Sequence, residues 1–285
     1  MMKHLQKLGS ALMLPVATLP ICGILMGLGY LLCPAYMMGG DWAASLGYAT
    51  SGVAYSVGFF LIKAGGALID NMAILFAIGT AVGLAKENNG TAGLAGLVSW
   101  LMITNLIGAA GSIVPNLAAI GNWGLAYSKI ANPFIGILAG VIGAVAYNKY
   151  KDTKLPDFLA FFSGKRFVSI ITALISILVS VALLFVWPVI FGVLVAAGQA
   201  IVGLDAIGAG IYAFLNRLLI PVGLHHALNN VFWFDTIGLG DLSAYWSGLT
   251  QGGTMANGTE ITWSVGMYMA GFFPCMMFGI PGAAL

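Results

Sequence analysis

Long, uninterrupted apolar stretches constrain this chain more than any other feature of its sequence. They stay apolar over helical lengths, whereas a membrane β-strand would alternate polar and apolar positions. Because a bilayer cannot pair exposed backbone groups, such stretches are expected to be α-helices. Of the 285 residues, 60% are hydrophobic and 7% are charged. This composition excludes an ordinary soluble domain and predicts an integral membrane protein.

Seven candidate spans follow from the need for about 20 apolar residues to cross the hydrocarbon core. They cover residues 11–33, 52–85, 92–110, 133–148, 168–195, 199–220 and 265–285. The second is too long for one straight helix and is predicted to break at Ala64-Gly65-Gly66, since broken helices line cavities in transporters. Residues 221–235 favour a re-entrant hairpin over a full crossing. The predicted fold class is an all-α polytopic helical bundle with broken helices and a re-entrant hairpin.

Basic residues are concentrated at the N-terminus and in two loops. Lys86 lies in the first loop, and the second extends from Lys149 to Arg166. The loop beginning at Cys33 has no basic residue, and the loop after the third span has only Lys129. The positive-inside rule therefore predicts a cytoplasmic N-terminus and two cytoplasmic basic loops.

Polar residues gather in one otherwise apolar segment, LNRLLIPVGLHHALNNVFWFD at 215–235. Polar side chains are costly in a membrane, so they usually face a cavity, a substrate or one another. Two further candidates, Asp70 and Asn71, lie in the second span. The candidate substrate-binding residues are Arg217, His225, His226, Asn229, Asn230, Asp70 and Asn71.

These residue types suit sugar recognition, although each has a structural alternative. A guanidinium offers several donors, and an imidazole donates or accepts at a hydroxyl. Arg217 could instead snorkel to the interface or pair with Asp205 or Asp235. His226 points about 100° from its neighbour in a helix, so packing is an equal alternative there. Asp70 could pair with Lys63, and the aromatic residues 232–234 fit an interfacial belt better than a sugar platform.

Other functional classes have little support. Cys22, Cys33 and Cys275 are interpreted as packing residues, because they are odd in number and widely separated. No metal site or cofactor is expected, since adjacent histidines lack the i,i+4 spacing of a shared metal site and the chain has no P-loop. A formal charge of +2 does not imply nucleic acid. Membrane lipid is the expected surrounding partner.

Four long motifs occur in a familiar order: IDNMAILFAIGTAVGLAKENNGTAGLAG at 69–96, YNKYKDTKLPDFLAFFSGKRFVSI at 147–170, LNRLLIPVGLHHALNNVFWFD at 215–235 and AGFFPCMMFGIPGAAL at 270–285. Together they resemble enzyme IIC, the membrane subunit of the bacterial sugar phosphotransferase system, in its glucose and N-acetylglucosamine branch. The resemblance covers residues 1–285 as one transmembrane domain, without a IIB or IIA domain. GLHHALNNVFWFD and FGIPGAAL are more similar to the N-acetylglucosamine permeases.

This resemblance implies a multi-pass permease of the bacterial inner membrane that forms a homodimer. It would bind N-acetylglucosamine or glucose for phosphorylation by a phosphocysteine of a separate IIB domain or protein. Arg217 matches the family's arginine before the histidine motif, and His225 matches its functional histidine, here the candidate catalytic residue.

The sequence departs from the family at its C-terminal side. The T-x-x-x-E-P-x-E motif, whose glutamate contacts sugar, has no counterpart, since Glu260 is followed by Ile261. The chain ends at Leu285 within an apolar run, so a C-terminally truncated permease is expected. With half a ligand shell, the chain alone is expected to insert in membranes without supporting phosphorylation, and its status as an enzyme stays open.

Two other functions also stay open. A proton- or ion-coupled secondary transporter would use Asp70, Arg217 and His225 as a relay. A non-transporting fragment would only assemble with partners. Uptake that requires the phosphoenolpyruvate relay and yields phosphorylated sugar distinguishes the permease from the secondary transporter.

The predicted topology can be tested by placing a cysteine at Thr153, inside the second basic loop. We expect the Thr153→Cys chain to resist an impermeant thiol reagent applied outside intact cells, because the positive-inside count places this loop in the cytoplasm. Ready labelling from outside would overturn the topology.

Overall fold

The computed structural model describes residues 2–33, 47, 49–121 and 123–219, together with residues 232, 244, 252–254, 260–261, 264–266 and 268. In these segments the regular structure is helical, apart from one antiparallel bridge between Thr254 and Glu260. The chain divides into two compact units. Unit 1 comprises residues 1–19 and 70–193, and unit 2 comprises residues 20–69 and 194–285.

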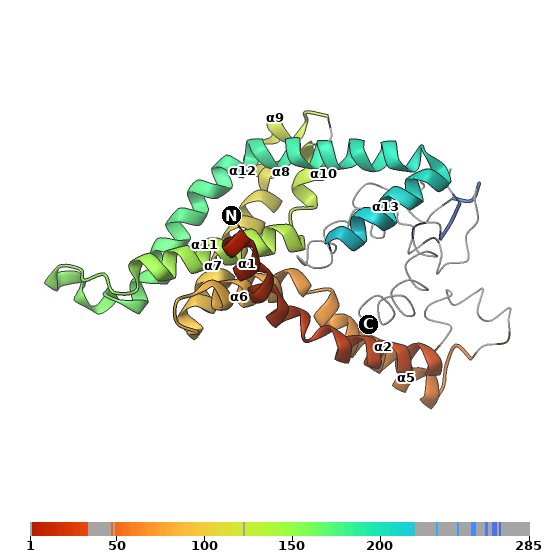
Figure 1. Ribbon diagram of the computed structural model, residues 1–285, viewed down its shortest axis with the longest axis horizontal. Helices are drawn as coiled ribbons and strands as arrows, with labels where there is room; N and C mark the ends of the chain where they lie inside the picture. The colour runs from red at the N-terminus through yellow and green to blue at the C-terminus, as the bar shows by residue number, and fades with distance from the viewer. Residues whose placement is uncertain are drawn as a thin grey trace. The chain divides into compact units, whose positions relative to one another are not determined.

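The α-helices of each unit are labelled in Figure 1. Those of unit 1 are α1 (Met2–Val16), α6 (Met72–Leu84), α7 (Gly90–Gly108), α8 (Ala110–Ile113), α9 (Pro115–Ala118), α10 (Trp123–Ser128), α11 (Pro133–Tyr150), the 3₁₀ helix η1 (Asp157–Phe162) and α12 (Lys165–Val202) as far as Val193. Those of unit 2 are α2 (Leu19–Leu32), α5 (Val53–Ile69), the remainder of α12, and α13 (Asp205–Leu219).

Length and composition allow two helices of the described part to cross a membrane. They are α7 and the segment Lys165–Gly198 of α12. A third span results if α5 and α6, which are separated only by residues 70–71, are counted together. These helices coincide with predicted spans, so the all-α membrane class is confirmed. The last predicted span, 265–285, lies largely outside the described residues, as does the predicted re-entrant hairpin.

The predicted first span, 11–33, is wrong as a single helix. The structure ends α1 at Val16 and begins α2 at Leu19. Thr18 closes α1, because both its backbone N–H and its hydroxyl donate to the carbonyl of Pro15, at 3.3 and 2.8 Å. Pro20 then occupies the first turn of α2, where a missing N–H costs nothing. Two prolines therefore divide a continuous apolar run.

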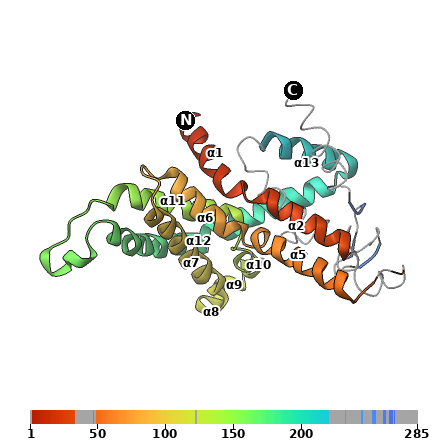
Figure 2. The same cartoon turned by 90° about the horizontal axis from the view of Figure 1, so that it is seen from below.

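The predicted break at Ala64-Gly65-Gly66 is also wrong, because α5 continues to Ile69. Gly65 serves close packing instead: a Cβ there would lie 2.6 Å from Cγ of Met26 and 2.8 Å from the carbonyl oxygen of Cys22. Helices α2 and α5 run side by side (Figures 1 and 2). Cys22 and Cys33 are buried, which confirms the packing interpretation for these two cysteines.

Helix α12 is longer than predicted. It runs unbroken through residues 196–198, where the sequence analysis separated two spans. Polar residues on its buried side are Thr172, Ser176 and Ser180, whose hydroxyls each donate to the carbonyl four residues earlier at 2.7 Å. Ser99 Oγ of α7 lies 2.9 Å from Ser176 Oγ. Leu174, Leu178 and other large apolar residues face outward, as expected of a helix surrounded by lipid.

Small residues let three helices of unit 1 approach at backbone distance. A Cβ at Gly136 of α11 would collide with the carbonyl oxygen of Ala73 in α6. One at Gly140 would lie 2.7 Å from the carbonyl oxygen of Ala77, and one at Gly96 of α7 would collide with the same atom. Lipid provides no hydrophobic force between helices, so close van der Waals contact of this kind stabilises their association.

Helix α1 packs antiparallel on α6. Pro15 lies against Gly79, where a Cβ would be 2.6 Å from the proline Cδ, and Ala11 lies against Gly83. Later residues of α6 thus meet earlier residues of α1. The N-terminal end of α1 therefore lies at the same end of unit 1 as Leu84, where the first basic loop begins.

An ionic cluster joins the two basic loops at that end. Glu87 forms an ion pair with Lys151, accepts a hydrogen bond from the Tyr147 hydroxyl at 3.1 Å, and lies 3.9 Å from Lys165 Nζ. The hydrogen bond from Lys151 lowers the pKa of Glu87 below its ordinary value. The same bond raises the pKa of Lys151. Both groups are therefore charged at neutral pH, and the two loops share one end of the unit.

The side chain of Asn148 adds a second connection at this end. It accepts from the backbone N–H of Lys86 at 2.7 Å and donates to the carbonyl of Leu84 at 3.2 Å. The Leu84 carbonyl belongs to the last turn of α6, where backbone acceptors have no partner within the helix. Helix α11 therefore caps α6 through one amide side chain.

A proline inside α12 leaves one carbonyl of that helix without its usual donor, and a neighbouring helix supplies a hydrogen bond to it. Pro188 has no N–H, so it cannot donate to the carbonyl of Leu184 four residues earlier. The hydroxyl of Tyr127 in α10 donates to that carbonyl at 2.7 Å. Nearby, Trp187 Nε1 donates to the carbonyl of Ala126 at 2.7 Å. These bonds fix α10 against α12.

The close contacts predict opposite effects of the same substitution at two helical glycines. Gly136→Ala should destabilise unit 1 by about 1–3 kcal/mol, because the added methyl group overpacks the contact with α6. Gly192→Ala is the matched control, since nothing lies within 4 Å of its Cβ position. It should be neutral or stabilising, because alanine favours helices over glycine by about 1 kcal/mol. Thermal loss of monodisperse protein in detergent measures both, and equal melting temperatures would contradict the packing argument.

The hydrogen bond from Tyr127 to the Leu184 carbonyl predicts that substitutions at Tyr127 and Pro188 have coupled effects on stability. Tyr127→Phe should cost about 1 kcal/mol, because it removes the donor to the Leu184 carbonyl. In a Pro188→Ala background the restored N–H can take that carbonyl, so the same change should cost less. A double-mutant cycle of thermal stability isolates the coupling. Additive effects would show that Tyr127 does not replace the missing amide.

Candidate functional site

The structure describes three of the seven predicted site residues. Arg217 belongs to unit 2, whereas Asp70 and Asn71 belong to unit 1. The remaining four, His225, His226, Asn229 and Asn230, lie outside the described residues. The adjacency of Asp70 and Asn71 is therefore the only grouping of predicted site residues within the described part of the chain.

Arg217 lies in the last turn of α13 and is exposed. Its position lets the positive charge interact favourably with the carbonyl end of the helix. The preceding residue, Asn216, is buried with 1% of its surface exposed. Successive residues of a helix point about 100° apart, so α13 buries the amide and presents the guanidinium outward.

An aromatic cluster packs Phe232 against α13. Phe232, at the end of the histidine motif, has its ring centroid 4.6 Å from that of Tyr212 and 5.1 Å from that of Tyr268. All three rings are buried. Phe232 is therefore a packing residue, which corrects its assignment to an exposed aromatic belt. Trp233 and Phe234 lie outside the described residues.

The buried amide beside Arg217 takes part in the same cluster. Asn216 Nδ2 donates to the Tyr212 hydroxyl at 2.9 Å, one helical turn earlier. This pair was not among the predicted site residues, because those candidates came from the 215–235 motif and the second span, and Tyr212 lies outside both. The available signal was the i,i+4 spacing of an asparagine and a tyrosine in an amphipathic helix. The pair positions the turn that carries Arg217.

Asp70 and Asn71 mark the interruption between α5 and α6, and both are exposed. The carbonyl of Asn71 accepts from the N–H groups of Ile74 and Leu75, at 3.0 and 3.3 Å, and so begins α6. The carboxylate and the amide therefore stand at a helix start rather than within a helix. Lys63, the alternative partner of Asp70, has its Nζ 5.4 Å from the Phe59 ring centroid.

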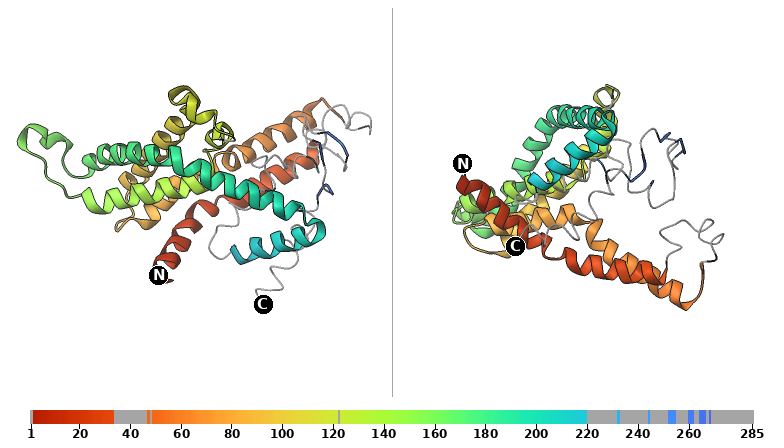
Figure 3. Two further views of the ribbon diagram at one scale, coloured as in Figure 1. Left: turned by 90° about the horizontal axis from the view of Figure 1, so that it is seen from above. Right: turned by 45° about the vertical axis from the view of Figure 1, so that its right-hand side comes forward.

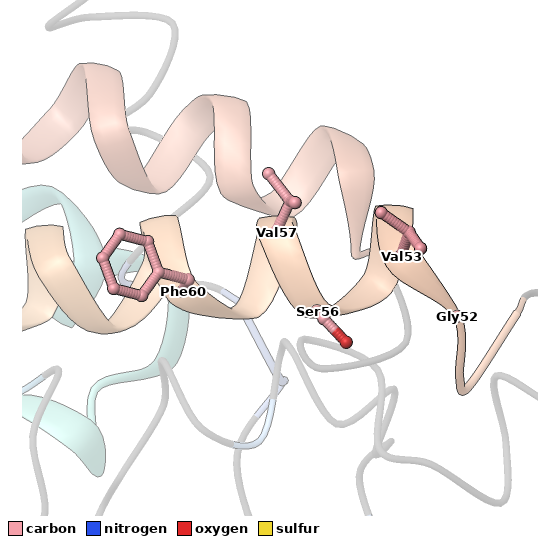
Figure 4. A pocket seen from close by; sticks show the side chains of 5 residues that line it. All are labelled: Gly52, Val53, Ser56, Val57 and Phe60. Atoms are coloured by element: carbon pink, nitrogen blue, oxygen red, sulfur yellow. The ribbon is translucent and has the colours of Figure 1, made fainter.

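A shallow groove of about 500 Å³ lies along the start of α5 (Figure 4). Its lining consists of Gly52, Val53, Ser56, Val57 and Phe60. Ser56 supplies the one side-chain hydroxyl, and the other lining side chains are apolar. A sugar requires several polar partners, so this groove does not fit a sugar. In the described segments, no three His, Cys, Asp or Glu side chains are grouped to hold a metal ion.

Comparison with known proteins gives a consistent result over the whole chain. A family model described as "Phosphotransferase system, EIIC" matches residues 9–285. The N-acetylglucosamine-specific EIICB component of Bacillus subtilis (strain 168) is 40% identical over 288 residues, which cover 100% of this chain and 53% of that protein. The N-acetylglucosamine-specific EIICBA component of Escherichia coli (strain K12) is 38% identical, covering 98% and 37%.

A relative with another sugar in its name is somewhat less similar. The glucose-specific EIICBA component of Staphylococcus carnosus (strain TM300) is 34% identical over 300 residues, covering 99% of this chain and 42% of that protein. The chain thus spans about half or less of the length of these curated relatives. Its match to the family model leaves out only the first eight residues. The chain therefore belongs to the EIIC family of the phosphotransferase system, a family of membrane permease domains.

Proposed function

We propose that this chain is the sugar-translocating part of a phosphotransferase permease whose substrate is N-acetylglucosamine. The observation that carries the proposal is the likeness along the entire chain to proteins named for that sugar, at 40% and 38% identity. The glucose-specific relative is 34% identical, so glucose is the second candidate substrate. A phosphorylated IIB domain is the proposed phosphoryl donor.

The proposed chemistry forms an O–P bond at a sugar hydroxyl and breaks the S–P bond of the donor's phosphocysteine. The hydroxyl proton passes to a base, which we assign to the imidazole of His225, and the cysteine leaves as a thiolate. Imidazole suits this role because its pKa lies near neutrality. The exposed guanidinium of Arg217 would bind sugar or phosphate oxygens through several donors.

The remaining predicted residues have supporting roles in this proposal. His226, Asn229 and Asn230 would complete the hydrogen bonds of the sugar, since amides supply both donors and acceptors. Asp70 and Asn71 would contribute from a helix interruption, as broken helices do in other transporters. Residues 221–235 would form the re-entrant hairpin that carries the histidines.

The proposed orientation places the N-terminus and both basic loops in the cytoplasm, with the chain in a bacterial inner membrane as a homodimer. Antiparallel packing of α1 on α6 and the Glu87–Lys151 ion pair support a common side for these segments. The excess of lysine and arginine there supports the cytoplasmic side.

Arg217→Gln and His225→Gln should each abolish sugar phosphorylation with little loss of membrane insertion. Each removes a polar partner worth about 1–3 kcal/mol, or a roughly fivefold to 150-fold loss of affinity, and His225→Gln also removes the proposed base. His226→Gln should be milder. The assay is formation of radiolabelled sugar phosphate in vesicles that contain this chain continued by the C-terminal part of the Bacillus subtilis relative.

Arg166→Gln is the matched control, because it neutralises the chain's other arginine outside the proposed site. It should retain activity. Near-normal phosphorylation by both site variants would refute the site assignment. Accumulation of free sugar driven by an ion gradient, without the phosphoryl donor, would favour the secondary transporter instead. Preference for glucose over N-acetylglucosamine in direct competition would correct the substrate.

A further inference from the structure

The loop between α11 and α12 exposes a cluster of large apolar side chains. Within η1, Phe158 is 83% exposed, Phe161 69%, Phe162 42% and Leu159 37%. This loop extends beyond the ends of both helices (Figures 1 and 3). Its apolar residues therefore lie beyond α11 and α12. Exposed apolar residues on those two helices are expected to contact hydrocarbon, but this does not account for the ones in the loop. Such a cluster in water normally indicates an interaction surface.

The loop is held in this conformation by hydrogen bonds of its own. The N–H of Gly164 donates to the carbonyl of Thr153 at 2.8 Å and closes the base of the loop. The N–H of Leu155 donates to Ser163 Oγ at 3.0 Å. Gly164 has a φ of 67°, which favours glycine. The phenylalanines are thus displayed by an ordered turn.

Basic residues flank the apolar cluster in the sequence. Residues 85–89 and 149–166, which Glu87 joins, contain six basic and three acidic residues, for a formal charge of +3. Glu87 forms an ion pair with Lys151 and approaches Lys165, whereas Lys86, Lys149 and Lys154 are exposed cations near the base of the loop. Arg166 stacks on Phe161, with Cζ 4.5 Å from the ring centroid. Rings and cations therefore form one surface.

We propose that this surface, defined by residues 149–166, docks on the anionic phospholipids of the adjacent membrane leaflet. Phenylalanine and leucine side chains next to lysines are the composition that binds the headgroup region, where rings enter the acyl boundary and cations meet lipid phosphates. The loop leads into α12, whose segment Lys165–Gly198 is long and apolar enough to cross a membrane, so the end of the loop at Lys165 is expected at the membrane surface. Its net positive charge complements an anionic leaflet, and lipid lies within reach without any other protein.

The docked loop has a mechanical consequence for unit 1. The Glu87 cluster connects the loop to the ends of α6 and α11, so lipid binding fixes the depth of these ends. A change from anionic to neutral lipid would release the loop while the ion pair and the hydrogen bonds at its base persist.

The test places a benzophenone-bearing phenylalanine analogue at position 158 of the full chain. The protein is reconstituted with phosphatidylglycerol and phosphatidylcholine, irradiated, and analysed for lipid adducts by mass spectrometry. The same analogue at Asp152, an exposed position at the base of the loop, is the control. We expect adducts of phosphatidylglycerol at 158 in clear excess over 152. The Lys149→Glu, Lys154→Glu double variant should lose the preference for phosphatidylglycerol.

Three outcomes would overturn the proposal. They are lipid adducts at 158 no more abundant than at 152, equal adducts with both lipids in the unsubstituted chain, and replacement of the lipid adduct by a protein adduct when a IIB domain is added. The last outcome would identify the surface as a protein-docking site. The assay needs neither sugar nor phosphoryl donor, so its failure leaves the proposed function untouched.

Discussion

Backbone contact at small residues is the constraint on which unit 1 depends. Apolar surfaces of helices gain nothing from meeting each other in lipid, so shape complementarity must hold them. Gly136, Gly140 and Gly96 allow this contact, because each places a backbone against the carbonyl oxygen of Ala73 or Ala77. Helix α1 also packs closely on glycines of α6, with the Pro15 ring against Gly79 and Ala11 against Gly83. Once these helices meet, their ends are close enough for side chains to connect the loops.

Polar groups then specify which ends belong together. Along α12 the hydroxyls of Thr172, Ser176 and Ser180 are satisfied by their own helix, which makes the buried side tolerable inside a membrane. At one end of the unit, Glu87 and Asn148 connect the turn after α6 with the end of α11. Apolar contact is similar at every depth, whereas these hydrogen bonds and ion pairs fix one register.

Sequence reasoning located the spans that have clear local boundaries. The predicted 133–148 became α11, which begins at Pro133 after Asn132, whose side chain accepts from the N–H of Ile135 at 3.1 Å. The short helices α8, α9 and α10 were not predicted. Helix α10 is held on α12 by two tertiary bonds, one from Tyr127 to the Leu184 carbonyl and one from Trp187 to the Ala126 carbonyl, and such bonds leave no periodic signal in the sequence. Sequence reasoning assigned Gly65 to a break for a related reason, since hydropathy cannot distinguish a glycine at a kink from one at a contact. Among the candidate site residues, the motif indicated Arg217, whereas the pair Asn216 and Tyr212 was not predicted because Tyr212 lies outside the motif.

The hydrogen bond from Tyr127 to the Leu184 carbonyl changes the usual effect of a proline on the bending of a helix. A proline usually leaves a carbonyl vacant and gives the helix a point at which it bends easily. Here the Tyr127 hydroxyl occupies that carbonyl, so bending α12 at this point is coupled to the position of α10. Displacement of α10 would free the acceptor and soften the long helix at its proline, whereas return of α10 would stiffen it. The position of α10 thus controls how easily α12 bends at its proline.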